Sequence, residues 1–346
     1  MRYLLNNSID PYFNMALDEF CLENIVLDEP YFYLWRNRPS VIIGLNQNAY
    51  SEVNLNYLNS NGITLARRVT GGGAVYHDLQ NLNYTIVSPL SNPTQSPCHP
   101  ERSEGSVERS EGSVERSEGS TPAPIVAALR ELGVPAELTG RNDIFVEGRK
   151  VSGYARRVSK RQEIIHGTLM YDVDIDTLTH VLDTPESKLN AKGIGSVKSR
   201  VANLKDYLPG FKSLDEVQAA LQRILAGGDS RMELTENQLD EVRIMAETKF
   251  STWDFIYGRS RQADLVRRAE LPCGTVEAAI SLDRGLITSV SFSGDFMFDE
   301  PVTELESELT GCRFECEALA RILDDATASR FFPGSTSTDI LGLLSL

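Results

Sequence analysis

The first 90 residues contain many strand-like segments but only one clear helix, and this order most constrains the fold. Segments rich in β-branched and aromatic residues, bounded by Gly, Asn and Pro, lie at 31–36, 40–45, 63–69, 73–78 and 82–89. Parallel strands need long crossover connections, usually helices, and the chain shows no regular alternation of strand and helix. The order therefore predicts an α+β domain built on a mixed sheet.

Helix signals are clearest where a capping residue precedes an apolar pattern. Asp10 followed by Pro11 is the order that starts a helix, and FNMALDEFCLENI continues it with apolar residues at helical spacing. PIVAALRELGV at 124–134 predicts a second helix that ends at Gly133. The remaining segments are a hairpin at 143–155 around Glu147-Gly148, a strand at 164–173, and helices at 215–228 and 236–250.

Residues 101–120 consist of the seven-residue unit ERSEGSV, repeated. Only the valine of each unit is apolar, whereas a coiled-coil seam needs two apolar positions per heptad. Gly, Ser and charged residues fill the other positions, which is typical of a disordered, solvated segment. The stretch from about 91 to 122 is therefore interpreted as an insertion in a loop, and it is left out of the fold prediction.

The character of the chain changes after Phe250. Short alternating strands with an Asp-Arg-Gly turn occupy GTVEAAISLDRGLITSVSFSGDF, and helical segments such as ECEALARILDD follow. This pattern predicts a second, smaller α+β domain over residues 247–346.

Charge and cysteine usage limit the functional classes. A net charge of −15 argues against a general nucleic-acid binder, because phosphate contacts need a basic surface. The five cysteines are scattered and form no CxxC pair, which favours free thiols in a reducing cytoplasm. The N-terminus has no basic region before an apolar run, and no long apolar stretch occurs, so we expect a soluble cytoplasmic protein without a membrane span.

The segment RRVTGGGAVYHD (67–78) is the first candidate site. It matches neither GxxxxGK[ST] nor GxGxxG. Consecutive glycines let backbone N–H groups approach a ligand, but they are equally suited to a tight bend between strands. Strand alternation would send Arg67 and Arg68 to opposite faces, with one arginine toward an anion and the other toward solvent. His77 lacks partners at metal-ligand spacing, and Asp78 orients its ring or caps a turn.

The hairpin segment GRNDIFVEGRKVSGYARR (140–157) is the second candidate site. Lys150 stands just after the turn, and Gly153 would let another chain approach. A lysine on a strand that faces a cavity supplies a compact positive charge for phosphate or carbonyl oxygens. An exposed hairpin lysine is the alternative.

These two segments, in this order, resemble the lipoate–protein ligase family of the biotin/lipoate ligase superfamily. The matching segments are LWRNRPSVIIGLNQNAYSEVN (34–54), ARRVTGGGAVYHD (66–78), GRNDIFVEGRKVSGYA (140–155), HGTLMYD (166–172), KGIGSVKSRVANL (192–204) and KFSTWDFIYGRS (249–260). The resemblance implies a mixed-sheet catalytic domain over residues 1–246, interrupted by the insertion, and a C-terminal accessory domain over 247–346. Leu45 departs from the pattern, because many relatives carry a basic residue there.

The resemblance implies an ATP-dependent ligase that converts lipoate to lipoyl-adenylate and transfers the lipoyl group to a lysine of an acceptor protein. Lys150 is then the catalytic residue, and Asp143 the ligand of Mg²⁺. Residues expected to bind ATP are Arg68, Gly73, Ala74, Val75, Tyr76, Asn142, Asp143 and Lys150. Residues expected to bind lipoate are Gly71, Gly72, His77 and Gly153. The implied acceptors are the lipoyl domains of 2-oxoacid dehydrogenase complexes and the glycine cleavage H protein, with no nucleic-acid or membrane partner.

Two other functions compete with this interpretation. An octanoyl- or lipoyl-transferase on the same fold would take its acyl group from a carrier protein without ATP, in some relatives through a cysteine nucleophile. Cys21 is the cysteine that could approach the site in space. A binding protein that only holds acyl groups would be expected to lose Lys150, which is present.

Overall fold

A mixed eight-stranded sheet organises the first part of the chain. Its strands are β1 Arg2–Leu4, β2 Tyr31–Trp35, β6 Asn81–Pro89, β7 Ala136–Thr139, β8 Asp143–Val146, β9 Arg149–Val158, β10 Gln162–Met170 and β11 Arg231–Met232. The computed structural model describes residues 1–90, 122–139, 142–182, 200–228, 230–258 and 263–344. The strand order is β11-β1-β2-β6-β10-β9-β8-β7. Strands β11, β1 and β2 are parallel and the other neighbours antiparallel, which confirms the mixed sheet.

A second, three-stranded sheet contains the glycine motif. It consists of β3 Ser40–Ile43, β4 Thr64–Arg67 and β5 Val75–His77, in the order β4-β3-β5. Strands β3 and β4 are parallel, and two short helices that the sequence did not reveal connect them, α2 Ala49–Glu52 and α3 Leu55–Ser60. The glycines lie between β4 and β5, which both pair with β3, so they join two strands of one small sheet.

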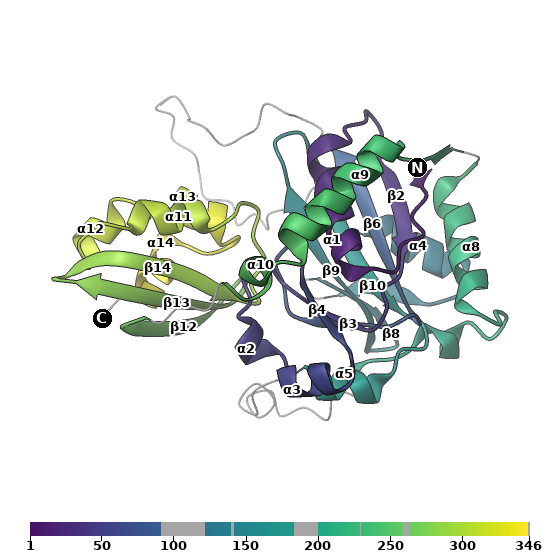
Figure 1. Cartoon of the computed structure of the whole chain (residues 1–346), viewed down its shortest axis with the longest axis horizontal. Helices are drawn as coiled ribbons and strands as arrows, with labels where there is room; N and C mark the ends of the chain where they lie inside the picture. The colour runs from purple at the N-terminus through teal and green to yellow at the C-terminus, as the bar shows by residue number, and fades with distance from the viewer. Residues whose placement is uncertain (91–121, 140–141, 183–199, 229, 259–262, 345–346) are drawn as a thin grey trace, which may run out of the picture.

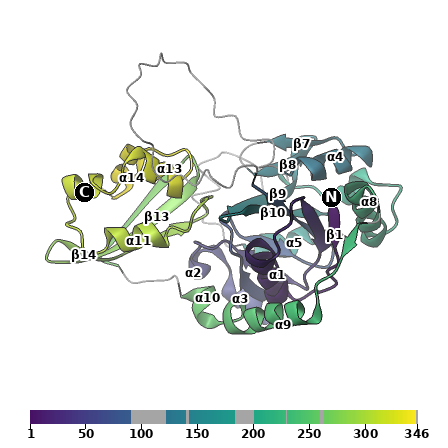
Figure 2. The same cartoon turned by 90° about the horizontal axis from the view of Figure 1, so that it is seen from above.

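The two faces of the large sheet are covered by different helices. Along β2, Phe32 and Leu34 pack into the core shared with α4 Ala123–Glu131 and α8 Leu214–Ala226. The alternate residues Tyr31, Tyr33 and Trp35 pack into the core shared with α1 Pro11–Asn24 and α9 Glu236–Met245. Figure 2 shows the two helix pairs on opposite sides. The second core also contains Ile42 and Ala66, which places the small sheet on the α1 side.

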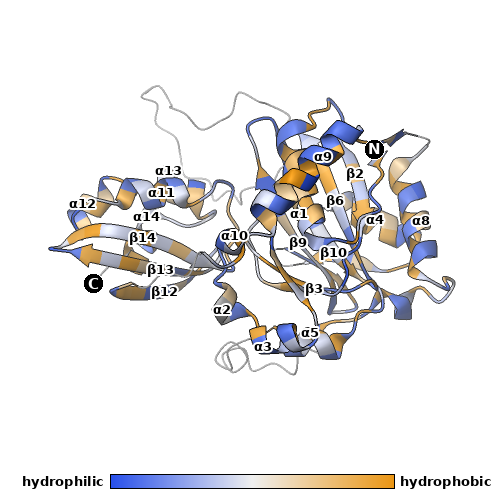
Figure 3. Ribbon diagram, viewed as in Figure 1, coloured by the Kyte–Doolittle hydropathy of each residue, from blue (hydrophilic) through white to orange (hydrophobic). Residues whose placement is uncertain are grey.

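Helix ends follow the signals in the sequence. The side chain of Asp10 caps α1 by accepting from the backbone N–H groups of Tyr12 and Phe13, as the Asp-Pro order predicts. Helix α8 starts at the capping residue Ser213 and ends at Gly227, which has the left-handed conformation. Its ribbon alternates hydrophobic and hydrophilic residues in Figure 3. Its buried residues repeat at helical spacing and face the large sheet.

The C-terminal domain has its own sheet and core. Strands β12 Leu265–Leu271, β13 Gly274–Asp283 and β14 Leu286–Gly294 form an antiparallel sheet. Helices α11 Thr303–Leu309, α12 Cys316–Ala320, α13 Asp325–Phe331 and α14 Ser337–Leu344 complete it. Figure 1 shows this domain beside the first one, with the helices gathered on one side of its sheet. Phe292, Phe296 and Phe332 meet in its core, and a smaller α+β domain is thereby confirmed.

The segment between the domains packs with the first domain. A π-helical turn, Ala246–Phe250, follows α9, and α10 Trp253–Tyr257 comes next. Phe250 is buried in the core beneath α1, and Ile256 is buried in a core that contains Val41 and Ile43 of the small sheet. The division expected at residue 246 stays a prediction. We propose instead that the two domains divide after α10, because these two residues anchor that segment.

Two further predictions were the loop insertion and the absence of a membrane span. The insertion lies outside the described residues apart from Pro122, which precedes α4, and part of the segment 192–204 lies outside them as well. Within the described ranges, no helix combines the length and the apolar character needed to cross a membrane.

Candidate active site

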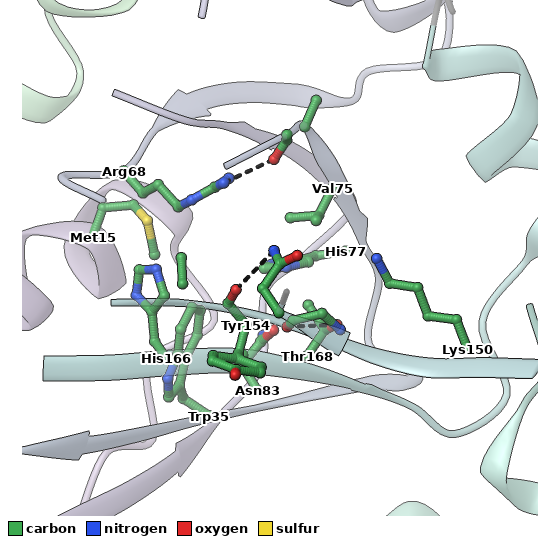
Figure 4. A pocket seen from close by; sticks show the side chains of 16 residues that line it. Met15, Trp35, Arg68, Val75, His77, Asn83, Lys150, Tyr154, His166 and Thr168 are labelled. Atoms are coloured by element: carbon green, nitrogen blue, oxygen red, sulfur yellow. Dashed lines mark hydrogen bonds between the residues drawn. The ribbon is translucent and has the colours of Figure 1, made fainter. Parts of the chain in front are cut away.

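A cavity lies between the two sheets of the first domain, with α1 at one end. Its walls come from the glycine motif, from the strands β2, β6, β9 and β10, and from Met15 of α1. Figure 4 shows Lys150 on one side of the cavity, with Met15 and His166 on the other. The lining residues are Met15, Trp35, Arg68, Gly73, Ala74, Val75, His77, Asn83, Asn142, Lys150, Gly153, Tyr154, Ala155, His166, Gly167 and Thr168. The two candidate sites therefore meet in one cavity.

Lys150 reaches the cavity from the start of β9, where a bulge shifts the register of β8 and β9. Its ammonium nitrogen lies 2.7 Å from Oδ1 of Asp143. Its side chain is 36% exposed, so the ammonium can exchange its partner. Gly153 leaves room for the lysine, because a Cβ there would lie 3.2 Å from Nζ. This geometry provides one cation on a cavity wall, with a carboxylate beside it.

The Arg68 side chain holds the glycine loop in shape. Its guanidinium lines the cavity and donates to the backbone carbonyls of Ile42, Gly71 and Gly73 at 3.0, 2.6 and 2.8 Å. Its Nε donates to the Thr70 hydroxyl at 3.1 Å. Burial lowers the pKa of Arg68 to about 10, which leaves it charged at neutral pH. The arginine thus places a positive charge at the cavity while it fixes the loop.

Strand alternation predicted that one arginine of the pair Arg67 and Arg68 would face solvent. This prediction is wrong, because Arg67 is buried as well as Arg68. The Arg67 side chain is fully buried and donates to the carbonyls of Gly44, Leu45 and Gln47 at 2.9, 2.9 and 2.6 Å. It also donates to the carbonyls of Phe255, at 2.7 Å, and Ile256 in α10. These five carbonyl oxygens give acceptors to the N–H donors of the buried guanidinium. The residue therefore ties α10 to the small sheet.

The glycine loop also touches the C-terminal domain. The Gly72 N–H donates to the Phe296 carbonyl at 3.2 Å. A Cβ at Gly71 would lie 2.4 Å from the same carbonyl oxygen. Leu45 packs against the core of the C-terminal domain, which accounts for an apolar residue at this position. Gly71 is therefore required by contact between the domains, a reason that the sequence does not indicate.

His77 is neutral and has one ring nitrogen without a partner. Burial, the Arg68 guanidinium and His166 lower the pKa of His77 to about 3. Nδ1 lies 3.1 Å from Nδ2 of Asn37, and Nε2 has no hydrogen-bond partner among the described residues. The Trp35 ring packs edge-on against the imidazole, with 6.0 Å between ring centroids. The side chain lines the cavity and is positioned by its contacts with Asn37 and Trp35.

A buried hydrogen-bond network that the sequence did not reveal connects α1 to the glycine motif. His166 lies 2.5 Å from Asp18 Oδ2 through Nδ1 and 2.7 Å from the Thr70 hydroxyl through Nε2. Asp18 Oδ1 accepts from the hydroxyls of Tyr33 and Thr85 at 2.6 and 3.0 Å. The Thr70 hydroxyl oxygen accepts from Arg68 Nε, so the hydroxyl proton is available for donation to His166 Nε2. The other ring nitrogen of His166 then carries a proton, and this Nδ1–H donates to Asp18.

The structure brings most of the predicted site residues to the cavity. Those that line it are Arg68, Gly73, Ala74, Val75, His77, Asn142, Lys150 and Gly153. Asp143 does not line the cavity itself, but it forms an ion pair with Lys150, which does. Tyr76 points away, as alternation along β5 requires, and packs with Val41 and Ile43. Gly71 and Gly72 lie in the same loop but do not line the cavity, because they contact the C-terminal domain.

Several lining residues were not predicted, notably Met15, Trp35, Asn83, Tyr154, His166 and Thr168. Trp35 and Asn83 are register partners on neighbouring strands, so both side chains point to the same face of the sheet. Period-two alternation from His166 to Thr168 on β10 could have indicated that they share that face. Their approach to the glycine motif depends on how the two sheets pack, and no local pattern indicates it.

Cys21 is not placed to act as a nucleophile. It is buried in the core beneath α1, and burial raises the pKa of its thiol to about 12. The thiolate, which is the nucleophilic form, is thus disfavoured at neutral pH. Among the cysteines that the structure describes, none lines the cavity.

Beside the cavity, Asp143 offers a carboxylate that could hold Mg²⁺. Within the described ranges, no three His, Cys, Asp or Glu side chains come together as a metal site. In nucleotide sites, however, Mg²⁺ is commonly held by one or two carboxylates together with phosphate oxygens and water. Asp143, a quarter exposed beside Lys150, fits the role of a single carboxylate ligand.

Comparison with known proteins identifies both parts of the chain. Residues 10–226 match the lipoyl protein ligase A/B catalytic domain, and residues 260–344 match the bacterial lipoate protein ligase C-terminus. The chain is 33% identical to lipoate-protein ligase LplJ of Bacillus subtilis, over 99% of this chain and all of that protein. It is also 33% identical to lipoate–protein ligase 1 of Staphylococcus aureus, over the full length of both.

Solved structures agree with this relationship. A Plasmodium falciparum LipL1 structure in complex with lipoate has the same fold, with a TM-score of 0.73 over 92% of each chain at 22% identity. A lipoate-protein ligase A bound with ATP is 28% identical, with a TM-score of 0.57 over 75% of this chain and 99% of that one. A bi-partite lipoate protein ligase of Thermoplasma acidophilum, solved in a study with its E2 lipoyl domain, is 31% identical, with a TM-score of 0.59 over 76% and 98%. The chain thus belongs to the lipoate–protein ligase family, in the form that carries both the catalytic domain and the C-terminal domain.

Proposed function

We propose that the protein is an ATP-dependent lipoate–protein ligase. The observation that carries the proposal is the meeting of Lys150 and the glycine motif on one cavity between the two sheets. Relatives that match the chain over its whole length are named lipoate–protein ligases, and structural relatives were solved with ATP or lipoate. The ligands named for those proteins are proposed here as substrates of this chain.

In the first half-reaction, a carboxylate oxygen of lipoate attacks the α-phosphorus of ATP, and the bond to pyrophosphate breaks. Two anions must approach each other, so fixed positive charge between them lowers the barrier. Lys150 and Arg68 supply that charge from different elements of the cavity wall. The carboxylate of Asp143 must then give up Lys150 to the phosphate, and the partial exposure of the lysine makes this exchange feasible.

In the second half-reaction, the neutral amine of an acceptor lysine attacks the acyl carbon. The bond to AMP breaks, AMP leaves with the electron pair, and the amine loses a proton as the amide forms. No enzyme nucleophile is required, which agrees with the burial of Cys21. The acceptors proposed are lipoyl domains, such as those of 2-oxoacid dehydrogenase complexes, and the glycine cleavage H protein.

The binding roles follow the cavity. The nucleotide would contact Arg68, Gly73, Ala74, Val75, Asn142 and Lys150, and the acyl chain would extend toward Met15 and His166. Mg²⁺ would be held by the nucleotide phosphates, with Asp143 as its protein ligand. When bound, it neutralises the charge of the leaving pyrophosphate.

The test combines the purified full-length protein with lipoate, ATP, Mg²⁺ and an acceptor lipoyl domain. We expect pyrophosphate release and a lipoyl mass increase on the acceptor by mass spectrometry, and loss of both signals in EDTA. Acyl transfer from an octanoyl-carrier protein, with none from free lipoate and ATP, would assign the protein to the transferases instead.

A further inference from the structure

The orientation of two buried asparagines determines which nitrogen of His77 carries its proton. Nδ2 of Asn14 lies 3.1 and 3.0 Å from the backbone carbonyls of Ser8 and Arg36, which can only accept. The atom of Asn37 that lies 2.8 Å from the same Nδ2 must therefore be the oxygen Oδ1. This assigns the amide orientation of Asn37 from fixed backbone groups.

The amide nitrogen of Asn37 then faces His77. Nδ2 lies 3.1 Å from Nδ1 of the ring, and it can only donate. Nδ1 must therefore accept, and in a neutral imidazole the proton is on the other nitrogen, Nε2. Asn14, Asn37 and His77 are all at least nine-tenths buried, so water does not compete freely for these groups.

The Nε2–H group is a buried donor without a protein partner among the described residues. An unpaired buried donor is costly, and such groups in native structures commonly serve a bound ligand. The ring lines the same cavity as Lys150 and lies on the Lys150 side of Met15 and His166 in Figure 4. Of the acceptor atoms in lipoate, the carboxyl oxygens are strong acceptors and the sulfur atoms are weak ones.

We propose that Asn14 and Asn37 are positioning residues that keep the proton of His77 on Nε2, so that this N–H donates to an oxygen of the acyl carboxyl group. The inference rests on the proposed function and extends it. As the amine attacks, that oxygen gains negative charge, and a donor already aimed at it becomes more effective. Arg68 and His166 both disfavour a second proton on the ring, and the titratable groups Lys150 and Tyr154 line the same cavity.

The tautomer can be read directly and without activity. Long-range 1H–15N spectra of the full-length protein labelled with 15N-histidine distinguish protonated from unprotonated ring nitrogens, and the His77→Gln variant identifies the His77 signals. We expect Nε2 to be protonated and Nδ1 unprotonated at neutral pH. The reverse assignment, or a doubly protonated ring, would overturn the inference whatever the enzyme does.

The Asn37→Asp variant tests the positioning role. A carboxylate beside Nδ1 accepts instead of donating, so it draws the proton to Nδ1 and leaves Nε2 as an acceptor when the ring is neutral. A protonated ring restores Nε2–H. The rate of lipoyl transfer by this variant should therefore fall at least tenfold, relative to wild type, as pH rises through the new pKa of the ring. A loss that is the same at every pH would mean that Asn37 only supports the fold.

One pair of variants tests the donor role of His77, and one exposed variant serves as a control for the Asn37→Asp substitution. His77→Gln places an amide N–H near the position of Nε2 and should retain activity within about tenfold, whereas His77→Leu should lose about a hundredfold. Equal losses in both variants would contradict a donor role. The exposed Asn61→Asp in the C-cap of α3 should follow the wild-type pH profile. If wild type does not use lipoate and ATP, the proposed function fails, and the spectra still decide the tautomer.

Discussion

Lys150 Nζ and Asp143 Oδ1, 2.7 Å apart, form an ion pair on the wall of the cavity between the two sheets. Each partner is partly exposed, so the pair contributes little to stability. The lysine is therefore held in place for another purpose, and we ascribe to it the charge that the proposed adenylation requires.

Replacement of Lys150 by Met should remove this charge and keep most of the side-chain volume. We expect the rate of pyrophosphate release to fall by roughly 10² to 10³, the loss typical when one stabilising charge or donor is removed. The melting temperature should change little. Lys205→Met is a matched control. Lys205 Nζ lies 2.6 Å from an oxygen of Asp172 in a similar ion pair, and neither residue lines the cavity. A Lys150→Met enzyme with near wild-type turnover would contradict the mechanism.

Gly71→Ala should disturb the contact between the two domains. Its Cβ would lie 2.4 Å from the backbone carbonyl of Phe296, which cannot move without the C-terminal domain. Such overpacking costs about 1 to 3 kcal/mol, measurable as a lower free energy of unfolding in urea. Gly73→Ala is the comparison, since its nearest new contact is 3.9 Å away. Equal destabilisation by the two variants would show that the contact with Phe296 is unimportant.

The lowered pKa of His77 predicts a pH dependence of stability. Its pKa is 6.5 ordinarily and about 3 in the fold, so below pH 6.5 the unfolded chain binds a proton that the folded protein does not. Stability from this group is complete above pH 6.5 and is lost as pH falls toward about 3. Between pH 7 and pH 5, wild type should lose about 2 kcal/mol more stability than His77→Gln. Urea unfolding at both pH values measures the difference, and parallel losses would mean that His77 becomes protonated in the fold.

Asp18→Asn should weaken the buried network around His166. Both carboxyl oxygens accept hydrogen bonds in the structure, from Tyr33, Thr85 and His166, and an amide nitrogen cannot accept. The unpaired group that results costs about 1 to 3 kcal/mol of unfolding free energy. Asp215→Asn removes the charge of an exposed carboxylate paired with Arg36 and keeps an oxygen that can accept, so its cost should stay below about 1 kcal/mol. Similar costs for the two variants would argue against a tightly coupled network.

Local patterns predicted the elements of the fold better than their arrangement. Asp10-Pro11 marked the start of α1, and Gly148 marked the turn between β8 and β9, because capping and turn chemistry act over a few residues. Helices α2 and α3 were missed because they have only four and six residues. Such short segments show too little periodicity to be recognised.

The site was predicted in part. The residues that were not predicted escaped notice for a common physical reason. Lys150 and Arg68 stand in recognisable motifs, whereas Asp18 and His166 are 148 positions apart and meet through packing of α1 on the large sheet. Likewise, the reason for Gly71 is a carbonyl of a different domain. Interactions between distant segments leave no periodic pattern in either segment.

Arg67 determines where the chain can be cut. Its buried guanidinium donates to the carbonyls of Phe255 and Ile256 as well as to three carbonyls beside the small sheet. A truncated protein that ends at residue 246 would lack these two acceptors of a buried cation, so we expect it to be less stable. Truncation after Gly258 would retain both acceptors. We therefore expect the smallest autonomous catalytic fragment to be about a dozen residues longer than a boundary at residue 246 would make it.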